Sequence, residues 1–200
     1  MSLFCSSVFA QKHEPFLADI QNKLDRDIKS APQENRLRMN QALESNMSND
    51  LVILNSLAKK PLKKNASGWP VCSDMVEISE SIFDRSRTFQ GLDVGLEYIL
   101  MAQMVGCPRV GPGSVLEASV ERIPRFLDRV ADALPSSFLS AKKELASRAF
   151  KQEFSQSIIE SVLMNGWTLC IQEEQEKLRT SGAVFEGALQ KSILVCKKQT

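Results

Sequence analysis

Residues 92–104 read LDVGLEYILMAQM, residues 105–113 read VGCPRVGPG, and residues 114–133 read SVLEASVERIPRFLDRVADA. In the first segment apolar residues recur at helical spacing, at positions 92, 96, 99, 100 and 104. The glycines and prolines of the second segment stop that helix. Ser114 and Glu117 then have the spacing of a capping box, in which each side chain satisfies a free amide of the first turn. The pattern predicts a hairpin of two helices.

Apolar positions on the second arm of this hairpin also follow the helical period. They are Val115, Leu116, Val120, Ile123, Leu127, Val130 and Leu134. Two arms that are both apolar and joined by a short turn belong at the centre of a helical domain. Pro124 lies inside the second arm, where it removes a helical hydrogen bond, so we expect a kink or a boundary between two shorter helices there.

The composition is that of an ordinary globular protein. Of 200 residues, 43% are hydrophobic and 24% are charged, and the formal net charge is +1. Attraction to phosphate or lipid must therefore come from local patches. The chain has only 9 Gly and 8 Pro and little alternation of apolar and polar residues, which favours an all-α fold. We expect a multi-helix bundle with a central apolar helical hairpin and a smaller helical C-terminal domain.

Further helices are expected on both sides of the hairpin. Before it we expect an amphipathic helix over 14–29, a short helix over 36–44, a helix capped at residues 48–50, and one capped by Ser73 or Asp74 that ends at 85–88. After it, Pro135 and the following serines are the predicted domain boundary. Residues 1–134 form the expected N-terminal bundle and residues 136–200 the expected C-terminal domain. The second part reads as one long helix from Phe138, an interruption at Asn165-Gly166, and a last helix after Gly182.

The five cysteines are scattered and form no CxxC pair. An odd number of dispersed cysteines suggests reduced thiols in a cytosolic or nuclear protein. Residues 3–10 resemble a signal peptide only faintly, because a basic start is missing and serines break the apolar run. We therefore do not expect secretion.

No catalytic residue, metal site or cofactor is expected. A nucleophilic cysteine needs a histidine, and a zinc site needs about four Cys or His ligands at matched spacing, whereas His13 is the single histidine. The glycines of residues 106–113 lack the lysine of a phosphate-binding loop and join two helices. The acidic residues at 173–176 read as a solvated face. The sequence therefore favours a protein that binds or assembles over an enzyme.

Two sets of basic residues are candidates for binding phosphate or acidic membrane. The lysine run consists of Lys59, Lys60, Lys63 and Lys64, and the arginine set of Arg122, Arg125 and Arg129 shares one helix face. Such charges can meet nucleic acid or anionic lipid, act as a nuclear import signal, or simply be solvated. Arg109, Lys142, Lys143, Arg148 and Lys151 are weaker candidates. Because few aromatic residues lie near them, we expect contact through phosphates and no reading of bases.

The order of these parts resembles the matrix proteins of orthomyxoviruses, the influenza-type family. An early amphipathic helix with Leu17, Ile20 and Leu24 precedes a basic run, and residues 96–104 then lead through a turn into a helix ending at 130–132. The resemblance suggests a divergent member, such as one from a fish-infecting genus. It implies a structural protein that polymerises under the viral envelope. By position, the lysine run would match the family's basic segment for nucleic acid, nuclear import and membrane.

This resemblance sets the expected partners and location. The partners are other copies of the chain, acidic membrane lipids, and the viral ribonucleoprotein or its RNA backbone, with no small-molecule substrate. The location is the inner face of the virion envelope and the host cytoplasm, plasma membrane and nucleus. Two alternatives stay open: a helical protein-interaction module such as an effector or chaperone, and a helical coat or nucleoprotein whose ligand is RNA.

Overall fold

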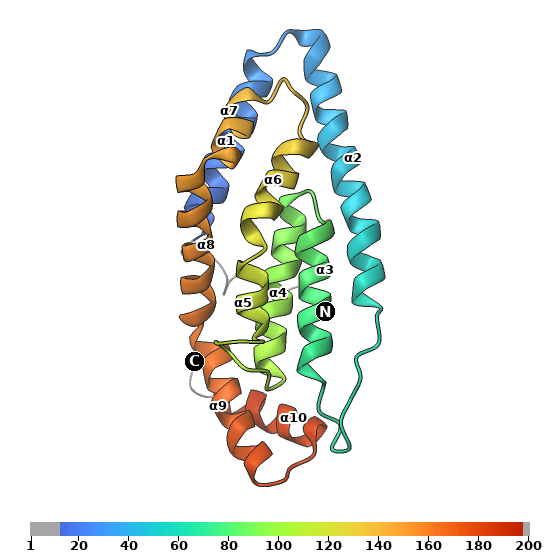
Figure 1. The fold of residues 1–200 in the computed structure, drawn as a ribbon, viewed down its shortest axis with the longest axis vertical. Coiled ribbons are helices and arrows are strands. Elements are labelled where there is room, and N and C mark those ends of the chain that lie inside the picture. The colour runs from blue at the N-terminus through green and yellow to red at the C-terminus, as the bar shows by residue number, and fades with distance from the viewer. Residues whose placement is uncertain (1–12, 198–200) are drawn as a thin grey trace.

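The computed structural model describes residues 13–197, which fold into ten helices arranged mostly along one long axis (Figure 1). Within this range the one β-type pairing is an isolated antiparallel bridge between Lys64 and Pro70. The predicted all-α bundle is confirmed. The helices are α1 (Glu14–Ser30), α2 (Gln33–Ala58), α3 (Cys72–Arg85), α4 (Phe89–Met104), α5 (Val115–Val120), α6 (Ile123–Ala133), α7 (Leu139–Ala146), α8 (Arg148–Leu163), α9 (Gly166–Thr180) and α10 (Phe185–Cys196).

The predicted hairpin lies at the centre of the bundle (Figure 1). Leu92 and Ile99 of α4 and Ile123 and Leu127 of α6 are completely buried. They belong to one apolar cluster that extends from Ile20 in α1 to Val162 in α8. This cluster includes residues on both sides of position 135, and the division into two domains stays a prediction.

Local sequence explains how the second arm of the hairpin is built. The arm is divided at Pro124 into α5 and α6, as expected, because proline is tolerated in the first turn of a helix and not in its interior. Ser114 caps α5: its hydroxyl accepts a hydrogen bond from the amide of Glu117 at 3.1 Å. The reciprocal half of the predicted capping box is wrong, since the amide of Ser114 donates to the carbonyl of Gly111.

The prediction of two separate helices before the lysine run, a short one over 36–44 and another capped at residues 48–50, is wrong. A single helix, α2, spans Gln33–Ala58, because that stretch contains no glycine or proline to interrupt it. Asp50, expected to cap a helix of its own, instead lies buried and caps α4 from the side. The cap predicted for α3 is also wrong: Val71 occupies the N-cap, and Asp74 lies inside the helix.

The long helix predicted from Phe138 is broken at Ser147. This serine has an extended backbone, and its hydroxyl accepts a hydrogen bond from the amide of Phe150, so that it ends α7 and caps α8. The start of α7 is capped by Asp27 of α1, whose carboxylate accepts from the amides of Ser140 and Ala141 at 2.9 and 3.1 Å. A side chain 113 residues away in the sequence thus caps this helix.

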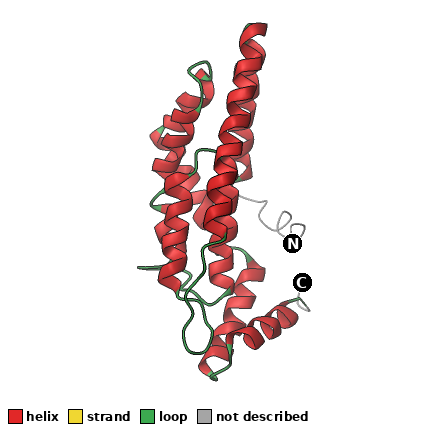
Figure 2. Cartoon of the chain, turned by 90° about the vertical axis from the view of Figure 1, so that its right-hand side faces the viewer, coloured by secondary structure: helices red, strands yellow, loops and turns green. Residues whose placement is uncertain are grey.

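Helices α9 and α10 form a C-terminal hairpin that closes one end of the bundle (Figures 1 and 2). It begins at the predicted interruption, where Asn165 caps α9. Three side chains on one face of α9 donate to carbonyls at and just beyond the end of α4: Gln175 to Met104, Arg179 to Gly106 and Gln172 to Cys107. These carbonyls would otherwise lack helical partners.

Trp69 anchors the other side of the C-terminal hairpin. Its side chain is buried, with 3% of its surface exposed. Its ring contacts Phe185 edge-on at 5.1 Å between centroids, and the guanidinium of Arg179 lies over it. Asn65 holds the loop as a turn, because its side-chain oxygen accepts from the amides of Ser67 and Trp69.

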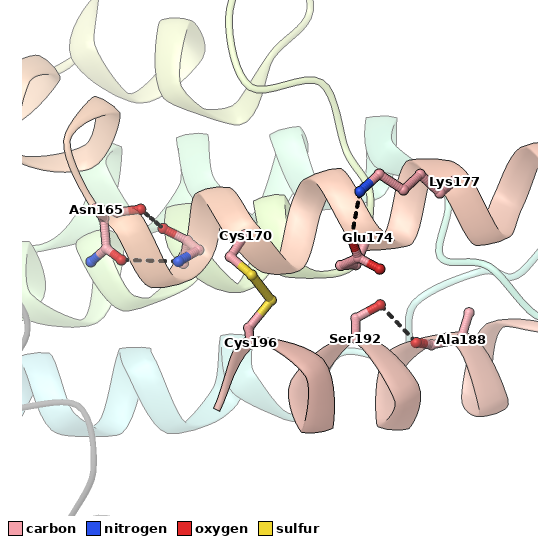
Figure 3. The surroundings of a disulfide bond; sticks show 8 residues. Asn165, Cys170, Glu174, Lys177, Ala188, Ser192 and Cys196 are labelled. Carbon is pink, nitrogen blue, oxygen red and sulfur yellow. Dashed lines mark hydrogen bonds and ion pairs between the residues drawn. A yellow bond between two sulfur atoms is a disulfide. The ribbon is translucent and has the colours of Figure 1, made fainter. Parts of the chain in front are cut away.

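Four cysteines form two disulfide bonds, so the expectation of reduced thiols is wrong for these residues. Cys72 and Cys107 join the start of α3 to the loop after α4, with 5.5 Å between their Cα atoms. Cys170 and Cys196 join α9 to α10, with 5.8 Å between Cα atoms (Figure 3). Cys5, like the signal-like residues 3–10, lies outside the described residues. Both bridges fasten the end of the bundle where the C-terminal hairpin docks.

Candidate anion-binding surface

The lysine run leaves the end of α2 and passes beside the first turns of α3. The ammonium of Lys60 lies 2.6 Å from a carboxylate oxygen of Glu77, and that of Lys63 lies 3.7 Å from one of Asp74. Asp74 also accepts a hydrogen bond from the backbone amide of Lys63. Within residues 13–197, Lys59 and Lys64 form no ion pair. Half of the predicted lysines are thus held by α3.

The arginine set, which we call the α6 arginines, packs against the other end of α3. Arg122 lies 2.7 Å from Glu80 and 3.3 Å from Asp84. Arg129 lies 4.0 Å from Asp84 and donates to the carbonyl of Phe83. Arg125 is exposed and forms no ion pair within the described part of the chain. Two of the three arginines therefore join α6 to α3.

One row of carboxylates on α3 serves both sets. The α3 acidic row consists of Asp74, Glu77, Glu80 and Asp84, spaced by three, three and four residues and therefore on one face of the helix. At about 1.5 Å per residue its ends lie roughly 15 Å apart. The structure thus places the lysine run and the α6 arginines along one helix, near opposite ends of it. Sequence spacing gave no sign of this link, because its ion-pair partners lie up to 45 residues apart in the chain, as Asp84 and Arg129 do.

Pairing does not remove these charges equally from the surface. The side chains of Lys60 and Lys63 keep 42% and 81% of their exposure. Exposed ion pairs are worth only about 0 to 1 kcal/mol, so a phosphate group can compete for these lysines. The side chains of Arg122 and Arg129 are only 24% and 28% exposed. Each contacts two groups of α3: Arg122 the carboxylates of Glu80 and Asp84, and Arg129 the carboxylate of Asp84 and the carbonyl of Phe83. Lys60 and Lys63 are therefore more available to bind a phosphate than Arg122 and Arg129, which mainly join α6 to α3.

Two further arginines lie beside this surface and were missed by the sequence analysis. Arg85 ends α3, and Arg87 lies in the turn before α4; both are exposed. Burial lowers the pKa of Arg129, Asp84 opposes that effect, and the like charges of Arg125 and Arg87 lower it further. Arg87, Arg125 and Arg129 therefore share one positive region. The sequence feature that could have identified Arg85 and Arg87 as candidates is the Arg-Ser-Arg triplet at residues 85–87.

The weaker basic candidates have mostly structural partners. Lys142 donates to the carbonyls of Ala131 and Leu134, which end α6. Lys151 pairs with Asp128. Burial lowers the pKa of Arg109, and Glu173 partly offsets this.

The described residues also include the single histidine. Burial lowers the pKa of His13, and Glu14 partly offsets this. Its Nδ1 lies 3.2 Å from the hydroxyl of Ser161. Within residues 13–197 no three His, Cys, Asp or Glu side chains gather as a metal site would require.

Compared with known protein families, curated proteins and solved structures, the chain matches none of them. No helix within residues 13–197 combines the length and the apolar character that crossing a bilayer requires.

Proposed function

We propose that this chain is a viral matrix protein: it self-assembles beneath an envelope, binds acidic membrane through its basic surface, and links that membrane to the ribonucleoprotein. It acts as a structural protein and not as an enzyme. The observation that carries the proposal is the shared surface along α3. Exposed Lys59, Lys64 and Arg125 flank the paired cations there, and Lys60 and Lys63 stay accessible.

Acidic lipid is the favoured ligand of this surface. Each cation close to an acidic bilayer contributes about 1 kcal/mol, so several separate, mobile lysines suit a flat, dense array of charges. Specific reading of a nucleic acid would need stacking side chains among the cations, and Trp69 is instead buried against Phe185. A lattice protein gains affinity from repetition, so each single contact can be modest.

Co-sedimentation with vesicles tests the membrane step. The double variant Lys59→Glu with Lys64→Glu should lose most binding to phosphatidylserine vesicles, and rising salt should release the wild type. The matched control, Lys29→Glu with Lys191→Glu, changes the net charge equally at exposed positions away from α3 and should bind nearly as wild type. Equal binding to phosphatidylcholine vesicles, or equal loss in the control, would contradict the proposal.

Electron cryo-microscopy of the coated vesicles tests the assembly step. An ordered protein layer that disappears at high salt supports a matrix. If RNA is the true ligand, purified protein should carry nucleic acid, and its affinity for RNA should fall steeply with salt.

The two disulfides favour a second candidate, a helical protein-interaction module that works in an oxidising compartment. Disulfides persist in such compartments and are rare in cytosolic proteins. This candidate predicts a monodisperse chain that forms a complex of fixed stoichiometry with one protein partner and does not coat vesicles.

A further inference from the structure

A pocket separate from the lysine run opens between α1, α2, α4 and α6. Its volume is about 370 Å³, which is within the usual range of about 300 to 1,000 Å³ for small-molecule sites. Most of its wall is apolar and comes from four helices. The apolar lining residues are Leu24, Leu43, Met47, Phe89, Val130 and Leu134.

The free polar groups of this pocket come from a single segment. Arg87, Gln90 and Asp93 belong to the turn before α4 and to its first turns. Polar groups elsewhere in the lining already have partners: Gln21 donates to Asp25, and Asn46 donates to the carbonyl of Ala133. The pocket therefore has one polar end and an apolar body, which is the arrangement that an amphiphile requires.

The charge around the polar end favours an anion at Arg87. This guanidinium is exposed and forms no ion pair within residues 13–197. Arg125 and Arg129 share its positive region. Of the nearby acids, Asp128 pairs with Lys151, and Asp84 pairs with Arg122 and Arg129. An anionic group at Arg87 would relieve the repulsion among these arginines. Asp93, also exposed on the lining, keeps that group on the Arg87 side.

Gln90 supplies a second, independent observation. Its side-chain oxygen is buried and accepts no hydrogen bond within the described residues. Leaving such an acceptor unsatisfied costs about 1 to 3 kcal/mol. That oxygen is closed to solvent as it stands, so a head-group hydroxyl would supply the missing donor once the Gln90 side chain rotates toward the pocket.

We propose that this pocket binds one single-chain anionic phospholipid, with its acyl chain among the apolar residues and its phosphate at Arg87. A glycerol hydroxyl of the head group then donates to Gln90. The site would hold one lipid molecule whether or not the chain forms a lattice, so it does not depend on the proposed function.

Isothermal titration with octanoyl lysophosphatidylglycerol tests the site, because this acyl chain is short enough for a pocket of about 370 Å³. The lipid is kept below its critical micelle concentration, and native mass spectrometry gives the stoichiometry. The expected result is saturable binding of one lipid per chain. Lysophosphatidylcholine with the same acyl chain should bind far more weakly, because its head group has no net charge and no free glycerol. Octanoate tests whether a carboxylate suffices, and we expect it to bind less tightly because it has no hydroxyl.

Two pairs of variants distinguish binding in this pocket from non-specific binding elsewhere on the surface. Arg87→Gln should weaken binding about tenfold, because a charge-assisted hydrogen bond is lost, whereas Arg85→Gln, two residues earlier at the end of α3, should not. Met47→Trp should block the pocket, whereas Leu51→Trp, one turn further along α2 and outside the lining, should bind as wild type. Circular dichroism establishes that each variant is folded.

The outcomes are distinguishable from those of the membrane experiment. Unsaturable binding, equal binding of both lysolipids, or full binding by Met47→Trp would overturn the pocket assignment, even if vesicles are coated. Saturable binding that the Arg87 and Met47 variants lose would support it, even if no vesicle is coated.

Discussion

The carboxylate of Asp50 accepts hydrogen bonds from both the backbone amide and the hydroxyl of Thr88, at 2.8 and 2.7 Å. It also accepts from the amide of Arg87 at 2.8 Å. Thr88 is the N-cap residue of α4, but its own side chain caps nothing. A buried carboxylate on α2 therefore replaces the local cap and fixes where the central hairpin begins.

Replacing Asp50 should lower the free energy of unfolding through its effect on the start of α4, while α2 itself stays helical. In Asp50→Ala the amides of Arg87 and Thr88 lose their acceptor, and we expect the free energy of unfolding to fall by about 1 to 3 kcal/mol. Urea denaturation measures this, and Asn49→Ala, an exposed neighbour, is the control. A loss as small as that of the control would mean that water satisfies these amides.

Gly95 should be intolerant of any side chain. A Cβ added there would lie 2.5 Å from the ring of Phe83, so α3 and α4 would have to separate. Gly95→Ala should therefore cost about 1 to 3 kcal/mol, although alanine favours helices. At Gly187 in α10 nothing lies within 4 Å, and Gly187→Ala should instead stabilise by up to about 1 kcal/mol. The opposite signs, measured by thermal denaturation, are the test; two changes of the same sign would refute the close-approach argument.

Periodicity predicted the elements that depend on local sequence. Of the apolar positions predicted in residues 92–104 and 115–134, all except Met104 lie in the core or pack against it, and Pro124 and Asn165 mark helix boundaries where expected. What periodicity missed are contacts across the fold. Asp27 and Asp50 cap helices far from them in sequence, and no local signal separates such residues from surface acids.

The candidate surface was predictable only in part. The lysine run and the α6 arginines were identified from charge and spacing, and whether they bind membrane stays a prediction. Their link through the α3 acidic row could not be inferred, because the sequence offered Asp74 only as a helix cap and gave no sign that Asp84 lies beside the α6 arginines. Arg87 joins the surface only because α3 and α4 meet in a turn beside α6. The disulfide pairs were likewise hidden by their wide spacing.

Tyr98 should titrate far above the ordinary value of a tyrosine. Burial, helped by the negative charge of Asp74, raises its pKa from 10.0 to about 12. Because the unfolded chain releases this proton near pH 10 and the folded chain holds it, the free energy of unfolding should fall as the pH rises through that window. The chain has one tyrosine, so phenolate absorbance after rapid pH jumps reports this residue alone. Ionisation near pH 10 in the folded protein would contradict the burial of its hydroxyl; the chain in denaturant provides the reference.

The Cys170–Cys196 bridge should stabilise the C-terminal hairpin mainly by restricting the unfolded chain. For a sequence separation of 26 residues the chain-entropy relation gives about 3 to 4 kcal/mol, so Cys170→Ser with Cys196→Ser should lower the free energy of unfolding by up to that amount. Alkylation under denaturing conditions without reductant should leave Cys72, Cys107, Cys170 and Cys196 unmodified. If all four are alkylated in protein taken from its natural source, the bridges do not form there, and the argument for an oxidising compartment fails. If the four cysteines are protected, the bridges exist in the natural source, and this result argues against a protein that works only in the reducing cytosol.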